Sequence, residues 1–199
     1  MDTEQDWIER ARQGDQIAFT RLVEAYQVPV YNLAYRMLGD PMEAEEAAQE
    51  TFLRAYRELH RYDPTRKFSA WLLAIAAHHC IDLLRRRRLT WLSLEEETLQ
   101  AEGWIGPETG PETDPEQAVE QAEREAQVQA LLATLPPDYR MAIVLRYWYD
   151  LSYEEIAQMT ESTVSAVKSR LFRARRMLAR AAQQAGLVPN TPRPASEPA

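Results

Sequence analysis

The chain has 199 residues, of which 27% are charged and 45% hydrophobic, a composition typical of globular proteins rather than disordered ones. No stretch approaches the roughly 18 apolar residues of a membrane span, and the acidic start MDTEQDWIER is unlike a signal peptide. A lone cysteine, Cys80, excludes an internal disulfide, so we expect a cytoplasmic protein without membrane insertion.

The formal net charge of −8 is unevenly distributed. Residues 1–88 carry 13 Lys/Arg and 14 Asp/Glu (net −1), residues 89–127 carry 1 and 11 (net −10), and residues 128–199 carry 9 and 6 (net +3). Because salt screens charges beyond about 8–10 Å, attraction to phosphate depends on local clusters more than on the total. The acidic total therefore does not exclude a nucleic-acid-binding protein.

Strong helix formers dominate the chain and glycine is scarce, which predicts an all-α fold. Turn residues at 39–41 and 62–65 should separate helices, and Pro41 is placed to begin one. We expect two helical domains joined by an acidic flexible linker. The predicted boundaries are 1–88 for the first domain, 89–120 for the linker, 121–186 for the second domain and 187–199 for a disordered, Pro-rich tail.

Residues 41–60 are predicted to form an amphipathic helix. Its apolar stripe is Ala44, Ala47/Ala48, Thr51/Phe52, Ala55 and Leu59, and its charged face is either an ordinary solvated surface or a docking surface. Residues 68–88, FSAWLLAIAAHHCIDLLRRRR, form another predicted helix that ends in four arginines. These arginines are either a hydrophilic helix end or an anchor for backbone phosphate. The adjacent histidines 78 and 79 point about 100° apart, which argues against a metal site.

The acidic linker contains three prolines, three glycines and a run of glutamates in LTWLSLEEETLQAEGWIGPETGPETDPEQ. It is interpreted either as a flexible tether that keeps the chain soluble or as a segment that threads a positively charged channel.

A helix-turn-helix is predicted between residues 152 and 176. Ser152 and Glu155 fit a capping box that begins a short helix, and residues 159–162 supply a break with a further cap. The next helix has an apolar stripe at helical spacing and basic residues on its other faces, with no acid between Glu161 and Glu197. Such a helix can enter the major groove, where arginine reads guanine or binds phosphate. The alternative is a solvated amphipathic helix with a basic face.

This second segment resembles region 4 of extracytoplasmic-function (ECF, group IV) sigma factors. The matching residues are Leu145–Arg146–Tyr147, Leu151 through Ala157, and the run VKSRLFRAR from Val167 to Arg175. The resemblance implies recognition of the −35 promoter element. Ala166 stands where the family has threonine, so the contact there is expected to differ. The expected −35 DNA-binding residues are Ser165, Ala166, Lys168, Ser169, Arg170, Arg173 and Arg176.

The first domain resembles region 2 of the same family. AEEAAQETFLRAY is similar to the motif that docks on the clamp helices of the polymerase's largest subunit, with Glu46 in place of aspartate. The stretch from Phe68 is similar to the surface that opens the −10 element, with His78 in place of asparagine. The resemblance implies polymerase binding by Glu46, Gln49, Glu50, Leu53 and Arg54, and −10 DNA binding by Lys67, His78, His79, Asp82, Arg85, Arg86, Arg87 and Arg88.

The resemblance implies a sigma factor that binds core RNA polymerase and directs promoter-specific transcription initiation. Its implied partners are the clamp helices, the flap of the second-largest subunit, promoter DNA and an anti-sigma factor. The sequence offers no phosphate-binding Gly-rich loop, nucleophile motif or metal cluster, so no enzyme, catalytic residue or cofactor is expected. The alternatives are a stand-alone helix-turn-helix transcriptional regulator and an adaptor whose acidic linker binds a basic partner.

Overall fold

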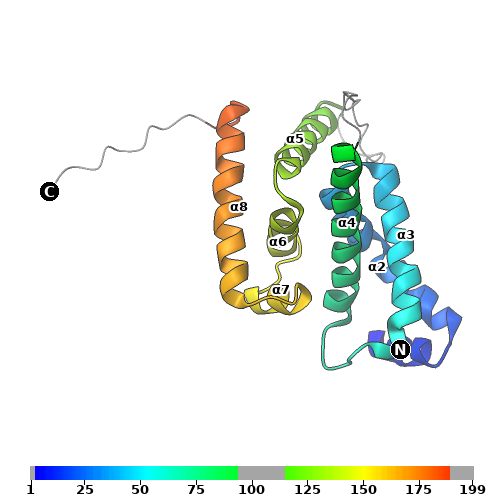
Figure 1. The fold of residues 1–199 in the computed structure, drawn as a ribbon. Coiled ribbons are helices and arrows are strands. Elements are labelled where there is room, and N and C mark those ends of the chain that lie inside the picture. Colours follow the sequence, from blue (N-terminus) through cyan, green and yellow to red (C-terminus); the bar gives the residue numbers. More distant parts are fainter. Residues whose placement is uncertain (1–2, 94–114, 189–199) are drawn as a thin grey trace.

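The computed structural model describes residues 3–93 and 115–188, and within these ranges it contains helices and no strands, as the all-α prediction required (Figure 1). The helices are α1 (Glu4–Arg12), α2 (Gln16–Leu38), α3 (Pro41–Glu58), the 3₁₀ turn η1 (Leu59–Arg61), α4 (Phe68–Ser93), α5 (Pro115–Ala133), α6 (Pro137–Tyr147), α7 (Tyr153–Met159) and α8 (Val164–Gln184). None of these helices is long and apolar enough to span a membrane.

The predicted break at 39–41 is confirmed and has a local chemical cause. Gly39 ends α2 with φ of 84°, a left-handed conformation that costs glycine little. The Asp40 side chain then accepts a 2.9 Å hydrogen bond from the Glu43 amide, and Pro41 occupies the first turn of α3. Three consecutive residues therefore end one helix and start the next.

Helices border the predicted linker on both sides. Helix α4 continues to Ser93 rather than ending at residue 88, and α5 begins at Pro115, where a proline suits the first turn of a helix. Residues 89–93 contain neither glycine nor proline, so nothing in their backbone chemistry ends α4. Linker residues 94–114 and tail residues 189–199 lie outside the described part of the chain.

Each half of the chain has its own buried side chains. In the first half, α3 and α4 pack against α2, and Leu22, Leu33 and Leu72 are almost completely buried between them. In the second half, α6 and α7 pack against α8 and bury Ile156 and Leu171. The buried positions follow the apolar stripes of each helix, which is the arrangement that amphipathic helices adopt around a core.

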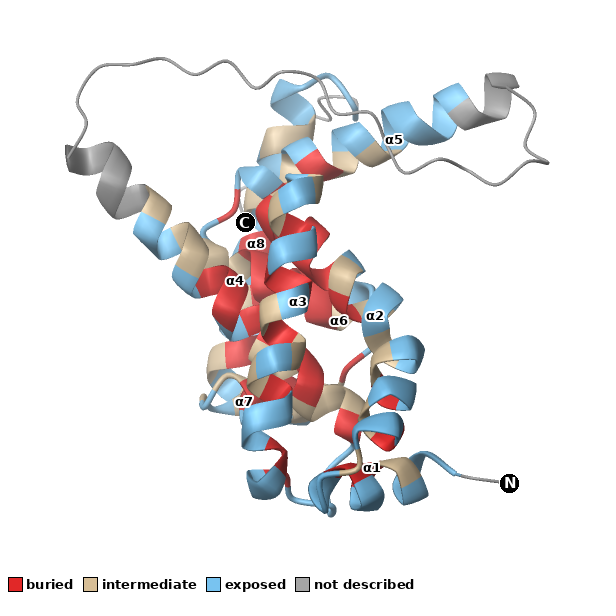
Figure 2. Cartoon of the chain, turned by 90° about the vertical axis from the view of Figure 1, so that its right-hand side faces the viewer, coloured by how far each residue is buried: buried red, intermediate tan, exposed pale blue. Residues whose placement is uncertain are grey.

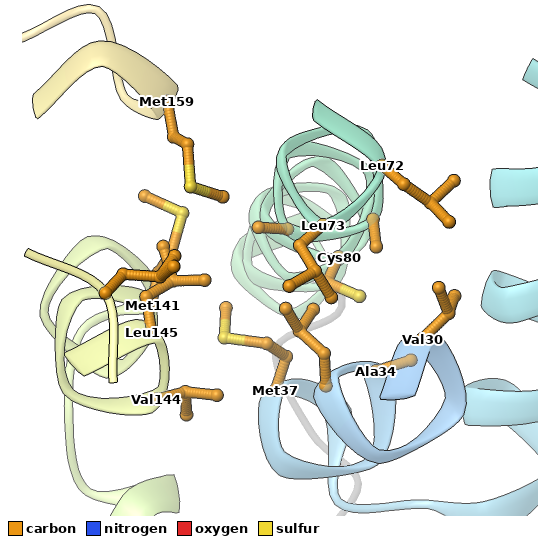
Figure 3. Close-up of a cluster of buried hydrophobic side chains, with 14 of the residues drawn as sticks. Val30, Ala34, Met37, Leu72, Leu73, Cys80, Met141, Val144, Leu145 and Met159 are labelled. Atoms are coloured by element: carbon orange, nitrogen blue, oxygen red, sulfur yellow. The ribbon is translucent and has the colours of Figure 1, made fainter. Parts of the chain in front are cut away.

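The two halves share one continuous core rather than lying apart on the linker. Helices α2 and α4 pack against α6, and α4 also packs against α7. Met37 and Leu73 face Met141, Leu145 and Met159 across this boundary (Figure 3). Buried residues gather in the middle of the molecule, where the helices lie closest together (Figure 2).

Two buried polar side chains of the second half bind the end of α2. The Gln129 amide nitrogen donates to the carbonyl oxygens of Tyr35 and Arg36, at 3.0 and 3.2 Å. The Arg140 guanidinium donates to the carbonyl oxygen of Met37. The carbonyls of Arg36 and Met37 lie in the last turn of a helix, where intrahelical donors run out, whereas the Tyr35 carbonyl also accepts from the Gly39 amide at 2.9 Å. The second half therefore completes the C-terminus of α2, which fixes a specific relation between the two halves.

Candidate nucleic-acid interface

Helices α7 and α8 form the predicted helix-turn-helix. The Ser152 hydroxyl accepts from the Glu155 amide at 3.1 Å, and the Glu155 carboxylate accepts from the Ser152 amide at 2.8 Å, which confirms the capping box. Glu161 takes a positive φ of 47° in the turn. The cap of α8 is Thr163, one residue beyond the predicted break at 159–162, and it accepts from the Ala166 amide at 3.1 Å.

The side of α8 that faces away from the core carries most of the predicted −35 residues. Val167, Leu171 and Ala174 are buried against the other helices. The exposed predicted residues are Ser165, Lys168, Ser169, Arg173 and Arg176, whereas Ala166 and Arg170 are half-buried. The helical spacing of about 100° per residue places positions 165, 169, 173 and 176 together, opposite the buried stripe.

Two basic side chains of α8 lie close to aromatic rings. Lys168 lies on a neighbouring side of the helix, with its ammonium 6.0 Å from the Tyr153 ring of α7. Phe172 is 55% exposed on the outward side, and the Arg176 guanidinium lies 5.7 Å from its ring. Phe172 is not among the predicted DNA-binding residues, although its spacing from positions 165, 169 and 176 is sufficient to place it on this side of the helix. An exposed aromatic beside arginines suits contact with bases.

Replacing Ser152 by alanine should lower the free energy of unfolding by about 1 kcal/mol, because it removes the acceptor that caps α7. Urea denaturation followed by circular dichroism measures this loss. Ser165→Ala is the matched control, since its exposed hydroxyl caps nothing, and it should change stability by less than about 0.5 kcal/mol. Equal stability of the two variants would contradict the role given to the capping box.

The predicted −10 residues lie on two different sides of α4 and its preceding loop. Lys67 and His78 line a pocket of about 630 Å³ together with the half-buried Trp71. His79 instead is 8% exposed and lines a separate pocket with Glu50 and other residues of α3. Burial lowers the pKa of His79. The structure therefore brings Lys67 and His78 together and separates His79 from them, as the rotation between adjacent helical residues requires.

The arginines at positions 85–87 of α4 also lie on two different sides of the helix. Arg85 is exposed and forms a 3.3 Å ion pair with Asp138 of α6. Arg86 is exposed on the α3 side, and the half-buried Arg87 pairs with Glu43 of α3. Asp82 is exposed one turn after His78, and the side chain of Arg88 lies outside the described residues. The predicted basic cluster is thus shared between two surfaces.

The pocket that contains Lys67 and His78 is closed on one side by the helix-turn-helix. The residues of the helix-turn-helix that form this wall are Glu155, Gln158, Met159 and Glu161. The Lys67 ammonium forms a 2.9 Å ion pair with the Glu155 carboxylate. This hydrogen bond, together with the Ser152 amide, lowers the pKa of Glu155 to about 2. The Glu155 carboxylate is therefore charged at neutral pH.

The predicted polymerase-binding residues share one side of α3. Glu46, Gln49 and Leu53 are exposed, Leu53 by 53%, and the half-buried Glu50 and Arg54 form a 2.8 Å ion pair. Beside Gln49 lies a shallow groove between α2 and α3 of about 410 Å³ whose apolar lining residues are Val23, Val28, Tyr31, Ala48 and Phe52. An apolar groove with a polar rim is the composition of a protein-binding surface.

In the part of the chain that the structure describes, no group of three or more His, Cys, Asp or Glu residues could hold a metal ion. Cys80 is buried at 1% exposure, and burial raises the pKa of its thiol to about 12.

Known proteins match both halves of the chain. The family model of Sigma-70 region 2 matches residues 22–90, and that of Sigma-70, region 4 matches residues 125–178. The chain is 38% identical over 173 residues to the ECF RNA polymerase sigma factor SigW of Bacillus subtilis (strain 168), an alignment that covers 86% of this chain and 92% of the relative.

Two further matches extend over nearly the whole chain. The RNA polymerase sigma-H factor of Pseudomonas aeruginosa is 35% identical over 183 residues, covering 92% of this chain and 95% of that one. Among solved structures, that of CnrH in complex with the cytosolic domain of CnrY matches with a TM-score of 0.64 and 26% identity, covering 89% of this chain and 96% of CnrH.

Proposed function

The chain belongs to the ECF family of RNA polymerase sigma factors, and from this premise we propose how its surfaces divide the recognition of a promoter. It binds core RNA polymerase and directs promoter-specific transcription initiation through −10 and −35 elements. Its site of action is the cytoplasm, where the polymerase works. A stand-alone helix-turn-helix regulator would leave the region 2 match over residues 22–90 without a role.

The outward side of α8 reads the −35 element in this proposal. Ser165 and Ser169 are small enough to approach base edges, and Arg173 and Arg176 lie beside them to bind guanine or phosphate. Phe172 adds an apolar contact for a thymine methyl group. The half-buried Ala166 and Arg170 border this surface, and Lys168 is held towards α7.

The pocket around Lys67, Trp71 and His78 receives the opened strand of the −10 element. A single strand needs a ring on which a base stacks and a positive rim that attracts its phosphates, and these residues supply both. Asp82 and Arg85 continue the same side of α4, one and two turns further on. On the other side of α4, three residues border α3: His79, Arg86 and Arg87. In this proposal they position α3 and do not contact bases directly.

The exposed side of α3 binds the clamp helices of the polymerase's largest subunit, and the second half binds the flap of the second-largest subunit. Leu53 lies among charged and polar neighbours on α3, an arrangement that suits a protein interface with a polar rim. An anti-sigma factor completes the set of partners. The similar protein CnrH has been solved in complex with the cytosolic domain of another protein, CnrY.

Run-off transcription with purified core polymerase, followed by genome-wide mapping of start sites, tests the function directly. We expect specific transcripts only when the chain is added. If the core enzyme starts no specific transcripts in the presence of this chain, the proposed function is wrong.

Replacing Gln49 and Glu50 together by alanine should weaken binding to core polymerase about fivefold, or about 1 kcal/mol, because both lie on the α3 surface. Competition with the unchanged chain for core enzyme measures the loss, and circular dichroism checks that the helices remain. The control replaces Gln121 and Glu123, which are exposed on α5, by alanine. If the α3 variant competes as well as the control, the docking surface lies elsewhere.

A further inference from the structure

Sulfur atoms gather where α2, α4, α6 and α7 meet. Met37, Met141 and Met159 are three of the chain's six methionines, and they are 0%, 3% and 8% exposed. Their side chains extend into the same apolar space, together with Leu73 of α4 (Figure 3). The flexible thioether suits such irregular gaps, yet mild oxidants convert it into a polar sulfoxide. The interior of this protein therefore contains side chains whose polarity an oxidant can change.

Met159 differs from the other two methionines because one side of it borders a pocket. It lines the pocket of about 630 Å³ between α4 and α7, beside the exposed Arg66 and Lys67. Among the described residues that line this pocket, neither Met37 nor Met141 occurs. A water molecule takes up about 30 Å³ in the liquid, and hydrogen peroxide, with one further oxygen atom, still fits such a pocket easily. A small hydroperoxide can therefore reach Met159 without unfolding of the chain.

The oxidation of Met159 needs no protein group besides its sulfur. A lone pair of the sulfur attacks one oxygen of hydrogen peroxide, an S–O bond forms as the O–O bond breaks, and the second oxygen takes a proton and leaves as water. Sulfur is oxidised by two electrons and the peroxide is reduced by two. Cys80, in the same cluster, differs because a thiol reacts as its thiolate. Burial raises the pKa of the Cys80 thiol to about 12, so it stays protonated and unreactive.

A sulfoxide at Met159 disturbs the packing of α7. Its S–O group is a strong hydrogen-bond acceptor that faces Leu73 and Met141, whose side chains supply no donor. A polar group buried without a partner is unfavourable. Helix α7 has only seven residues, Tyr153–Met159, and so short a helix depends on tertiary packing for its stability. Loss of the Met159 contact should therefore loosen the whole of α7.

We infer that Met159 is a site of reversible oxidation by hydroperoxides, and that its sulfoxide loosens α7 from α4 and α6. A methionine sulfoxide reductase returns the sulfoxide to the thioether, so the change is a switch rather than permanent damage. This role goes beyond the proposed function and does not depend on it, because it follows from the packing and the chemistry of the Met159 side chain.

The order in which the methionines are oxidised tests access to Met159. The unchanged full chain is treated with hydrogen peroxide, and mass spectrometry of its peptides follows each sulfoxide over time. Met42, which is 75% exposed, should react first. Met159 should follow, about tenfold faster than the completely buried Met37. If Met159 reacts only as fast as Met37, the oxidant reaches both by global unfolding, and the pocket gives no access.

Hydrogen exchange of the oxidised chain tests the loosening of α7. We expect the amides of residues 156–159 to exchange about tenfold faster once Met159 is a sulfoxide, while the amides of α3 keep their rates. The melting temperature should fall by about 5 °C. Treatment with methionine sulfoxide reductase should restore both quantities. If Met159 is oxidised and the exchange of α7 stays the same, the sulfoxide does not act on this helix.

Two leucine variants assign the effect to one sulfur. Met159→Leu keeps the volume and the apolar character of the side chain but cannot form a sulfoxide, so peroxide should change neither its exchange nor its melting temperature. Met42→Leu is the matched control on the exposed side of α3, and it should respond to peroxide as the unchanged chain does. An equal response of Met159→Leu would assign the effect to another methionine and overturn the inference. The peptide and exchange measurements on the unchanged chain decide the question even if Met159→Leu fails to fold.

Discussion

Replacing Arg140 by alanine should lower the free energy of unfolding by about 3 kcal/mol, because it removes charged donors from buried carbonyl oxygens. Arg140 is 7% exposed, and its guanidinium donates to the carbonyl oxygens of Ala133 at 3.0 Å, Leu135 at 3.4 Å and Met37. Burial lowers the pKa of Arg140 to about 10, so the side chain still carries its charge at neutral pH. Urea denaturation followed by circular dichroism measures the loss.

Two further variants show whether the Arg140 contacts are responsible. Arg140→Lys keeps the charge but places a single ammonium on a side chain without the planar fork, so it should recover only part of the stability. Arg124→Ala is the control, because Arg124 is 69% exposed in an ion pair with Glu120 and should contribute less than about 1 kcal/mol. If Arg140→Ala were as stable as Arg124→Ala, the three carbonyl contacts would contribute little to folding.

The features that the sequence predicted correctly are those whose causes are local. Gly39, Asp40 and Pro41 end one helix and begin another by conformational preference and side-chain capping alone. The Ser152 capping box requires residues only three apart. The apolar stripes of α3 and α8 follow from helical periodicity, which depends on spacing and on no distant contact.

The association of the two halves could not be predicted in the same way. Gln129 and Arg140 look like ordinary polar residues of amphipathic helices, and their partners on α2 lie more than 90 residues earlier in the chain. Backbone carbonyl acceptors carry no sequence signature, because every residue has one. The division of the −10 residues between two sides of α4 was available from spacing, since the neighbours His78 and His79 must point apart.

Replacing Arg173 by alanine should weaken binding to a −35 element by about 1–3 kcal/mol if its guanidinium reads a base. Arg173 is exposed on the outward side of α8, in line with Ser165 and Ser169, so it can enter the major groove without rearrangement of the helix. A contact to a base should also relax the preference for one base pair, whereas a contact to phosphate alone should weaken all sequences equally. Electrophoretic mobility shifts of holoenzyme on a mapped promoter and its single-base variants distinguish these two results.

Arg175→Ala is the matched control for charge, because it removes one exposed arginine from the same helix. At about 100° per residue, Arg175 lies on the flank of α8 nearer to the buried stripe, outside the group formed by positions 165, 169, 173 and 176. Its loss should therefore reduce affinity slightly and leave base preference unchanged. If Arg173→Ala and Arg175→Ala lose the same affinity on every sequence, α8 is held in the groove by its overall charge and Arg173 reads no base. Run-off transcription at normal levels from a −35-dependent promoter by Arg173→Ala would lead to the same conclusion.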